Sequence, residues 1–224
     1  MVRSRVVGVL LFGLGMLGMT LSTVQAAEKP IALFNGKDLT GWRTYPDPKL
    51  KLAKVPENFV QIRDGVMILP GETMGAIETI DEYSNYTLRL EYRWGEKITK
   101  SRNSGILLHV SGPDAVWPRS IEAQVAAGKA GDLWAVSGYQ LEGELSRKDP
   151  KTGRRYFRSE NDIEKPIGEW NVYEITCKNQ TITLTVNGKL VNQATKLESN
   201  RGKILLQSEG AEIHFRNIQL TPLR

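Results

Sequence analysis

The sequence is poor in the residues that bind transition metals or form disulfides. It has one cysteine, Cys177, and two histidines among 224 residues. A lone cysteine cannot form an internal disulfide, and these numbers are too small for a three-histidine or cysteine-based zinc site. After residue 26 the sequence also lacks the motifs G-x-S-x-G, G-x-x-x-x-G-K-[ST] and G-x-G-x-x-G. These absences argue against serine hydrolases of the nucleophile-elbow type and against P-loop and Rossmann nucleotide-binding proteins.

One long hydrophobic run is present, and it lies at the N terminus. Arg3 and Arg5 precede the apolar run Val6–Val24, and small residues follow up to Ala26. A basic start, an apolar middle and a small-residue end are typical of a secretory signal peptide. We therefore expect residues 1–26 to be removed and the mature protein to be periplasmic or secreted, with no membrane attachment. The alternative is an uncleaved anchor helix, although the run is short for a span.

The remaining chain carries only a small net charge. From Ala27 onward there are 28 basic and 25 acidic residues. The exception is the segment 146–160, SRKDPKTGRRYFRSE, in which basic residues are interleaved with Tyr156 and Phe157. This pattern can bind nucleic acid, but export and the small net charge favour a solvated hairpin beside a pocket, or a rim for an anionic or sugar ligand. No nucleic-acid partner is expected.

Short alternating segments predict an all-β domain over residues 27–224. Phe59–Arg63 and Val66–Leu69 flank an Asp-Gly pair, which is a hairpin signal. Tyr86–Trp94 alternates between apolar and polar residues, and Gly105–Val110 is almost continuously apolar, as in a central strand. Many short strands separated by Gly, Asn and Asp predict a single domain, an antiparallel β-sandwich of two sheets.

The segment Arg102–Tyr139 holds the residues that could carry chemistry. Its predicted strand Ser120–Val125 alternates, so Glu122 and Gln124 point to the same face. A carboxylate beside an amide, with tryptophans in the flanking loops, can form a sugar site, because aromatic rings stack on sugar C–H faces and polar groups bind hydroxyls. The alternative is the solvated face of a half-exposed strand.

His109 ends the apolar strand, where it could act as a base or pack as a core histidine. The candidate substrate-binding residues are Arg102, Asn103, Ser104, Trp117, Arg119, Gln124, Asp132, Trp134 and Tyr139.

The segment Leu33–Trp42, LFNGKDLTGW, resembles the opening motif of the 3-keto-disaccharide hydrolase family, exported bacterial proteins with a concanavalin-like sandwich. Further segments that agree, in order, are Asn103–Gly105, Glu122–Gln124, Gly168–Tyr173, Val186–Gly188 and Phe215–Ile218. After Gly131 the chain departs from the family's common small-residue pattern, which leaves the substrate's identity open. The resemblance implies a concanavalin-like jelly roll and a hydrolase that cleaves glycosidic bonds of 3-keto-glycosides or 3-keto-disaccharides.

The chemistry implied by the resemblance is elimination followed by hydration. Oxidation at C3 acidifies the C2–H bond, so a base can remove that proton, and the enolate expels the group on C1 before water adds. Glu122 is the expected base and His109 the expected acid or second base. Arg102, Asn103 or Arg119 would stabilise the enolate oxygen. The substrate is a small carbohydrate, and an oxidase that makes 3-keto sugars is an implied functional partner.

Two alternatives stay open. A retaining glycosidase of the same fold needs two catalytic carboxylates about 5 Å apart, but Glu122 is followed by Ala123–Ala126, with no second acid. A non-catalytic carbohydrate-binding sandwich would instead use Trp117, Trp134 and Gln124 to hold a sugar. No cofactor is evident. A structural or catalytic divalent cation stays open, although no Asp-rich loop has calcium-loop spacing.

Overall fold

The computed structural model describes Met1 and residues 28–224, so the expected signal peptide lies outside the described residues. The first strands are β1 (Ile31–Ala32), β2 (Trp42–Pro46), β3 (Gln61–Arg63), β4 (Val66–Leu69), β5 (Gly75–Thr79), β6 (Tyr83–Ser84), β7 (Tyr86–Ile98), β8 (Gly105–Ser111) and β9 (Arg119–Gln124). The remaining strands are β10 (Leu133–Val136), β11 (Glu142–Gly143), β12 (Arg155–Tyr156), β13 (Asn171–Lys178), β14 (Thr181–Val186), β15 (Lys189–Thr195), β16 (Arg201–Ser208) and β17 (Ala211–Pro222). Two short 3₁₀ helices are η1 (Pro48–Leu50) and η2 (Leu145–Arg147).

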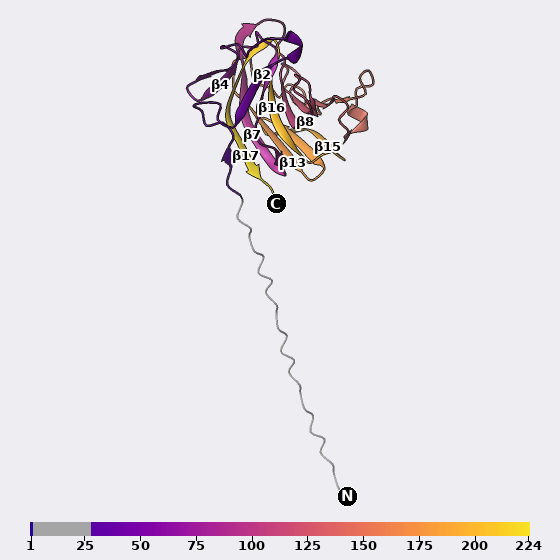
Figure 1. The fold of residues 1–224 in the computed structure, drawn as a ribbon. Helices are drawn as coiled ribbons and strands as arrows, with labels where there is room; N and C mark the ends of the chain where they lie inside the picture. Colours follow the sequence, from indigo (N-terminus) through magenta and orange to yellow (C-terminus); the bar gives the residue numbers. More distant parts are fainter. Residues whose placement is uncertain (2–27) are drawn as a thin grey trace.

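The strands form two antiparallel sheets packed face to face (Figure 1). The nine-stranded sheet has the order β11-β15-β14-β13-β7-β17-β4-β3, with β1 added beside β17. The eight-stranded sheet has the order β12-β10-β9-β8-β16-β5-β2, with β6 added beside β16. The predicted all-β antiparallel sandwich of two sheets is confirmed.

The alternation of apolar residues along the strands builds the core between the sheets. In β7, Tyr86, Leu88, Leu90 and Tyr92 are fully buried, and the residues between them are half-exposed. The hairpin predicted around Asp64 joins β3 to β4, and this residue has a φ of 50°. Aspartate tolerates the left-handed conformation that such a turn requires.

The loop between β8 and β9 covers part of the outer face of the eight-stranded sheet. It lies over a small apolar cluster formed by Tyr45, Ala76, Leu107, Val110 and Leu205. The hydroxyl of Tyr45 donates to the carbonyl of Ala115 at 3.4 Å, and the Gln207 amide donates to the carbonyl of Val116 at 2.8 Å. The neighbouring part of this face, over β9 and β10, carries the candidate site.

The segment 137–160 joins the two sheets along one side of the sandwich (pink to light orange in Figure 1). It first adds β11 to the edge of the nine-stranded sheet and then adds β12 to the edge of the eight-stranded sheet. Tyr156 of β12 is only 4% exposed. Tyr156 therefore anchors the basic segment 146–160 in the core, whereas most of the other side chains of this segment are exposed, as expected of a solvated hairpin.

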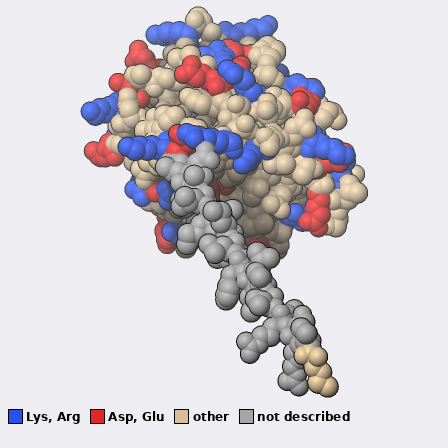
Figure 2. All heavy atoms as spheres, turned by 90° about the horizontal axis from the view of Figure 1, so that it is seen from below, with Lys and Arg blue, Asp and Glu red and all other residues tan. Residues whose placement is uncertain are grey.

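The protein surface carries both signs of charge. On the face seen in Figure 2, basic and acidic side chains are interspersed. Within residues 28–224, no helix is long and apolar enough to cross a membrane.

Candidate functional site

Strand β9 presents Glu122 and Gln124 on the outer face of the eight-stranded sheet. Between them, Ala123 is fully buried in the core, as the alternation predicts. Glu122 lies opposite Trp134 of β10, and Gln124 lies opposite Gly105 of β8. The pair is almost fully covered, with 6% of Glu122 and 7% of Gln124 exposed. Glu122 and Gln124 therefore do not form the solvated strand face that was the alternative.

The Glu122 carboxyl group lies above the backbone of Gly105, beside the side chain of Gln207. A Cβ atom at Gly105 would lie 2.5 Å from Oε1 of both Glu122 and Gln207, which is far closer than real Cβ contacts. Gln207 is oriented by the bond from its Nε2 to the Val116 carbonyl, so its Oε1 is presented toward Glu122. This buried Oε1 has no hydrogen-bond partner among the described residues. A glycine is needed at position 105 because the two polar side chains occupy the space above it.

Burial raises the pKa of Glu122 to about 8. The negative charge of Glu209 raises this pKa further, and the positive charge of Arg154 acts in the opposite direction. A carboxyl group with this pKa is mostly protonated at neutral pH, so it can donate a proton or a hydrogen bond.

Glu209 is a second carboxylate of the site that the sequence interpretation did not identify. It follows directly after β16, two residues beyond Gln207, and a buried Oε2 of this residue has no protein partner in the part of the chain that is described. Burial raises its pKa to about 7, whereas the side chain of Asn103 and the charge of Lys100 lower it. The sequence signal was Gln207-Ser208-Glu209 at the end of an apolar strand, an alternation like that of Glu122 and Gln124.

A pocket of about 480 Å³ opens beside these carboxylates. It is lined by Ser101, Arg102, Asn103, Gln124, Ala126, Ala127, Lys129, Trp134 and Arg155. The structure therefore brings together four of the predicted binding residues, Arg102, Asn103, Gln124 and Trp134, next to Glu122. Oε1 of Gln124 accepts bonds from the backbone N–H groups of Val125 and Ala126, at 3.0 and 2.8 Å. This leaves the Gln124 NH₂ group to face the pocket as a donor.

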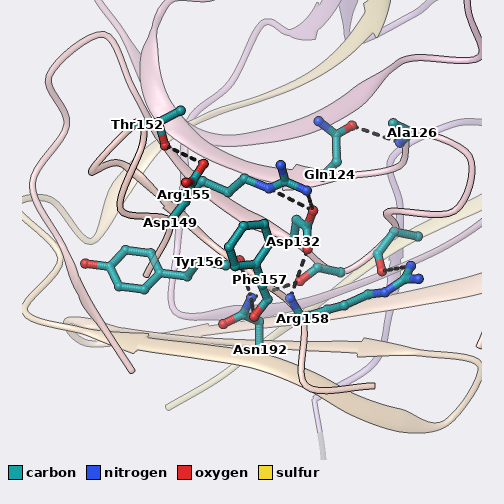
Figure 3. A network of polar contacts seen from close by, with 12 residues as sticks. Gln124, Ala126, Asp132, Asp149, Thr152, Arg155, Tyr156, Phe157, Arg158 and Asn192 are labelled. Carbon is teal, nitrogen blue, oxygen red and sulfur yellow. Dashed lines mark hydrogen bonds and ion pairs between the residues drawn. The ribbon is translucent and has the colours of Figure 1, made fainter. Parts of the chain in front are cut away.

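The basic segment 146–160 supplies one wall of this pocket. The guanidinium groups of Arg154 and Arg155 lie over the Trp134 ring, at 5.0 and 5.2 Å from its centre. Asp132, which is 2% exposed, forms an ion pair with Arg155 and accepts a bond from the Arg158 backbone N–H at 2.9 Å (Figure 3). Asp132 was expected to contact substrate. Its carboxylate instead holds Arg155 at the wall of the pocket. The Trp134 ring, which was expected to stack on a sugar, is in contact with the guanidinium groups of Arg154 and Arg155.

His109 does not belong to the site. It is 1% exposed and lies on the core side, where Nδ1 is 3.3 Å from the Tyr139 hydroxyl and the ring is edge-on to Tyr86. Burial lowers its pKa to about 4, so the ring is neutral at physiological pH. The expectation that His109 supplies an acid beside Glu122 is wrong, as is the expectation that Tyr139, which is 3% exposed, contacts substrate. Both residues are part of the core.

Three further predicted binding residues have structural contacts elsewhere. Arg119 forms two bonds of 2.6 Å to the carboxylate of Glu198. Ser104 is fully buried and donates to the Gln207 carbonyl at 2.8 Å. Trp117 is 39% exposed on the loop between β8 and β9, outside the residues that line the pocket. None of these three side chains lines the pocket.

The described residues contain no cluster of three or more His, Cys, Asp or Glu side chains arranged to hold a metal ion. The candidate site is thus a pair of partly protonated carboxyl groups beside a pocket rich in amide, indole and guanidinium groups.

The family assignment rests on nearly the whole folded chain. The model of the 3-keto-α-glucoside-1,2-lyase-like domain matches residues 29–221. The chain belongs to this family. The resemblance found in the motifs is thereby confirmed, and family membership supports a carbohydrate-active function. No curated protein matches the chain.

Solved structures share the fold of this family member. A candidate glycosyl hydrolase from Parabacteroides distasonis ATCC 8503 has 22% sequence identity and a TM-score of 0.63, over 87% of this chain and 94% of that one. A β-glucanase of Bacillus licheniformis has 13% identity and a TM-score of 0.56, over 89% and 99% of the two chains. The carbohydrate-binding module CBM66 of Bacillus subtilis has 12% identity and a TM-score of 0.53, over 81% and 95%. At these identities the likeness is one of fold.

Proposed function

We propose that this protein is an exported enzyme that cleaves glycosidic bonds of 3-keto-glycosides by elimination and hydration. The observation that carries the proposal is the pair Glu122 and Glu209, two mostly buried carboxyl groups with raised pKa values beside one pocket. Raised carboxyl pKa values close to neutrality suit proton transfer, because each group can then both give and take a proton. A carboxylate with a purely structural role does not need a pKa close to neutral pH.

The two carboxyl groups take different roles in the proposed reaction. Glu209 has the lower pKa and removes the proton from C2, and the electron pair moves into the enolate at C3. The C1–O bond then breaks, and protonated Glu122 delivers its proton to the leaving oxygen. In the second half, water adds to C1 of the enone while C2 regains a proton, so the net change is addition of one water across the glycosidic bond. These roles replace the expectation that Glu122 is the base.

Donors at the pocket support the enolate in this scheme. The amide groups of Gln124 and Asn103 and the guanidinium of Arg102 line the pocket. The two carboxyl groups lie behind this lining, since Trp134 is the cross-strand neighbour of Glu122 and the Asn103 side chain bonds to Glu209. Donors fixed before the reaction stabilise a developing oxyanion without having to reorganise. Arg119, the third expected donor, is bound to Glu198 and takes no part.

A second candidate function is an ordinary glycosidase with two catalytic carboxylates. The sequence argument against it was the missing acid near Glu122, and the structure places a second carboxyl group, that of Glu209 after β16, close enough for its charge to raise the pKa of Glu122. Such an enzyme would cleave unoxidised sugars and leave the C2–H bond intact.

The deciding experiment compares a methyl 3-keto-glucoside with the unoxidised methyl glucoside in deuterated water. We expect cleavage of the keto-sugar alone, with enzyme-dependent deuterium at C2 of the product after a buffer-only control is subtracted. Cleavage of the unoxidised sugar without C2 exchange would replace the proposal by the ordinary glycosidase. Binding of either sugar without cleavage would indicate a carbohydrate-binding module.

The proposal includes a place for the protein outside the cytoplasm. The basic and apolar pattern of residues 1–26 supports export to the periplasm or the medium. Because the substrate must be oxidised at C3 before the C2 proton is acidic enough to remove, a sugar 3-oxidase is the implied functional partner.

A further inference from the structure

The polar groups that line the pocket are dominated by hydrogen-bond donors. Gln124 is oriented so that its NH₂ group faces the pocket, because both backbone bonds of its amide group end on Oε1. The Trp134 Nε1 and the Arg102 Nε are buried and have no hydrogen-bond partner within residues 28–224. Both atoms can only donate. The donors that belong to the lining residues and can reach a ligand are the Gln124 NH₂ group, the guanidinium of Arg102 and the ammonium of Lys129, so a ligand that fits this pocket supplies acceptors.

Three cations at the pocket have no acidic partner among the described residues. Arg102 comes from the connection between β7 and β8, Lys129 from the connection between β9 and β10, and Arg154 from the basic segment 146–160. Arg102 and Lys129 line the pocket, and Arg154 lies over Trp134 and acts on the charge of Glu122. Arg155, the fourth cation, is paired with Asp132. Two of these cations thus line one hollow, and the third lies over the tryptophan ring that lines it.

Nearby carboxyl groups do not cancel this charge at neutral pH. Burial keeps Glu122 mostly protonated, and it keeps Glu209 close to half-protonated. Asp132 is matched by Arg155. The field in the pocket is therefore positive, although basic and acidic residues are almost balanced over the mature chain.

We propose that the pocket recognises a substrate whose leaving group carries a carboxylate, held by Lys129 and Arg154. This inference rests on the proposed function and narrows its substrate class. An enolate carries one developing charge at one oxygen, which the Arg102 guanidinium and the amide groups already satisfy, so Lys129 and Arg154 exceed what the proposed reaction needs. Arginine pairs with carboxylates through two parallel hydrogen bonds, and lysine adds a mobile charge at the exposed rim.

The test uses two aryl 3-keto-glucosides that differ in one group, a 4-carboxyphenyl and a 4-carbamoylphenyl leaving group. For the parent protein we expect kcat/KM to favour the carboxylate about tenfold or more, since a hydrogen bond to a charged group contributes about 1.5–3 kcal/mol. In Arg154→Gln and Lys129→Gln, whose side chains are exposed, this preference should fall several-fold, mainly through KM. Lys151→Gln, on the same basic segment but outside the pocket, is the matched control and should keep the preference.

The readout is the ratio of kcat/KM for the two substrates. Loss of Arg154 also changes the pKa of Glu122, but this change affects both substrates and cancels in the ratio. Equal cleavage of both substrates by the parent would overturn the carboxylate inference and leave the proposed function standing. Cleavage of neither would count against the proposed function. In that case calorimetric titration with the unoxidised 4-carboxyphenyl and 4-carbamoylphenyl glucosides decides the inference, which equal Kd values or no binding would overturn.

Discussion

Oε1 of Glu122 and Oε1 of Gln207 share the space above Gly105. Both atoms would be acceptors if Glu122 were ionised, and the Gln207 amide cannot turn its NH₂ group toward Glu122 without losing the bond to the Val116 carbonyl. A proton on Glu122 lowers the electrostatic repulsion between these two oxygen atoms. The local geometry and the raised pKa of Glu122 therefore favour the same protonation state.

Glu122→Gln and Glu209→Gln should differ in how their rates depend on the leaving group. If Glu122 protonates the leaving oxygen, Glu122→Gln loses about 10²–10⁴ in kcat with a methyl leaving group and much less with 2,4-dinitrophenyl, which needs no acid. Glu209→Gln loses the base and should be slow with both substrates. Steady-state rates on the two 3-keto-glucosides give the comparison.

The control for these variants is Glu142→Gln, an exposed ion-paired glutamate on β11. It should behave as the parent does. If Glu122→Gln lowers kcat by the same factor for the methyl and the dinitrophenyl substrates, Glu122 is not the acid for the leaving oxygen.

The titration of Glu122 should make the fold less stable as the pH rises. In the unfolded chain this group loses its proton near pH 4.5, whereas in the fold it keeps the proton up to about pH 8. Between these values the folded protein binds more protons, so the free energy of unfolding falls with increasing pH, by up to about 1.4 kcal/mol for each pH unit. Urea unfolding across this window should show Glu122→Gln gaining stability relative to the parent. A constant difference between the two proteins at all pH values would contradict the raised pKa.

The titration of His109 should make the free energy of unfolding rise with pH, in a lower pH range than that of Glu122. Its pKa is about 4 in the fold and 6.5 in the unfolded chain, so the unfolded state binds more protons between these values and stability is lost as the pH falls. His109→Asn should remove this contribution, and Asn tolerates the φ of 52° at this position. The free energy of unfolding of parent and variant, followed from pH 7 to pH 4, checks the prediction; parallel curves would refute it.

Gly105→Ala should impair catalysis more than folding. The three nearest atoms to the added methyl group are side-chain atoms, Oε1 of Gln207 and Oε1 and Cγ of Glu122, so both side chains must be displaced, at a cost of roughly 1–3 kcal/mol. Displacing the Glu122 carboxyl should lower kcat strongly. Gly95→Ala is the matched control, since its Cβ meets the flexible side chain of Glu212 instead. Equal kcat losses in the two variants would show that position 105 has no special role.

The sheets could be predicted from the sequence because alternation records which side of a strand is buried. The same alternation placed Glu122 and Gln124 correctly on one face. Alternation also marks Gln207 and Glu209, but it could not show that Glu209 lies near Glu122, because that depends on the long-range pairing that brings β16 next to β8.

His109 was misplaced for a related reason. A register shift between β8 and β9 follows Leu108, and His109 has a positive φ next to it. The regular period of two therefore does not give the side-chain direction at this position. The contribution of Arg154 and Arg155 was equally hidden, since it depends on β12 returning to pair with β10.

The segment between β10 and β13 gives the protein a further property. Its two short strands, β11 and β12, each form one edge of a sheet, where a long, exposed strand would favour pairing with another molecule. The wall that carries Arg154 and Arg155 is also the cover that separates β15 and β10 from neighbouring molecules. Replacing this segment to alter specificity would expose β15 and β10. Changes that alter the selectivity of the pocket would therefore also affect the solubility of the protein.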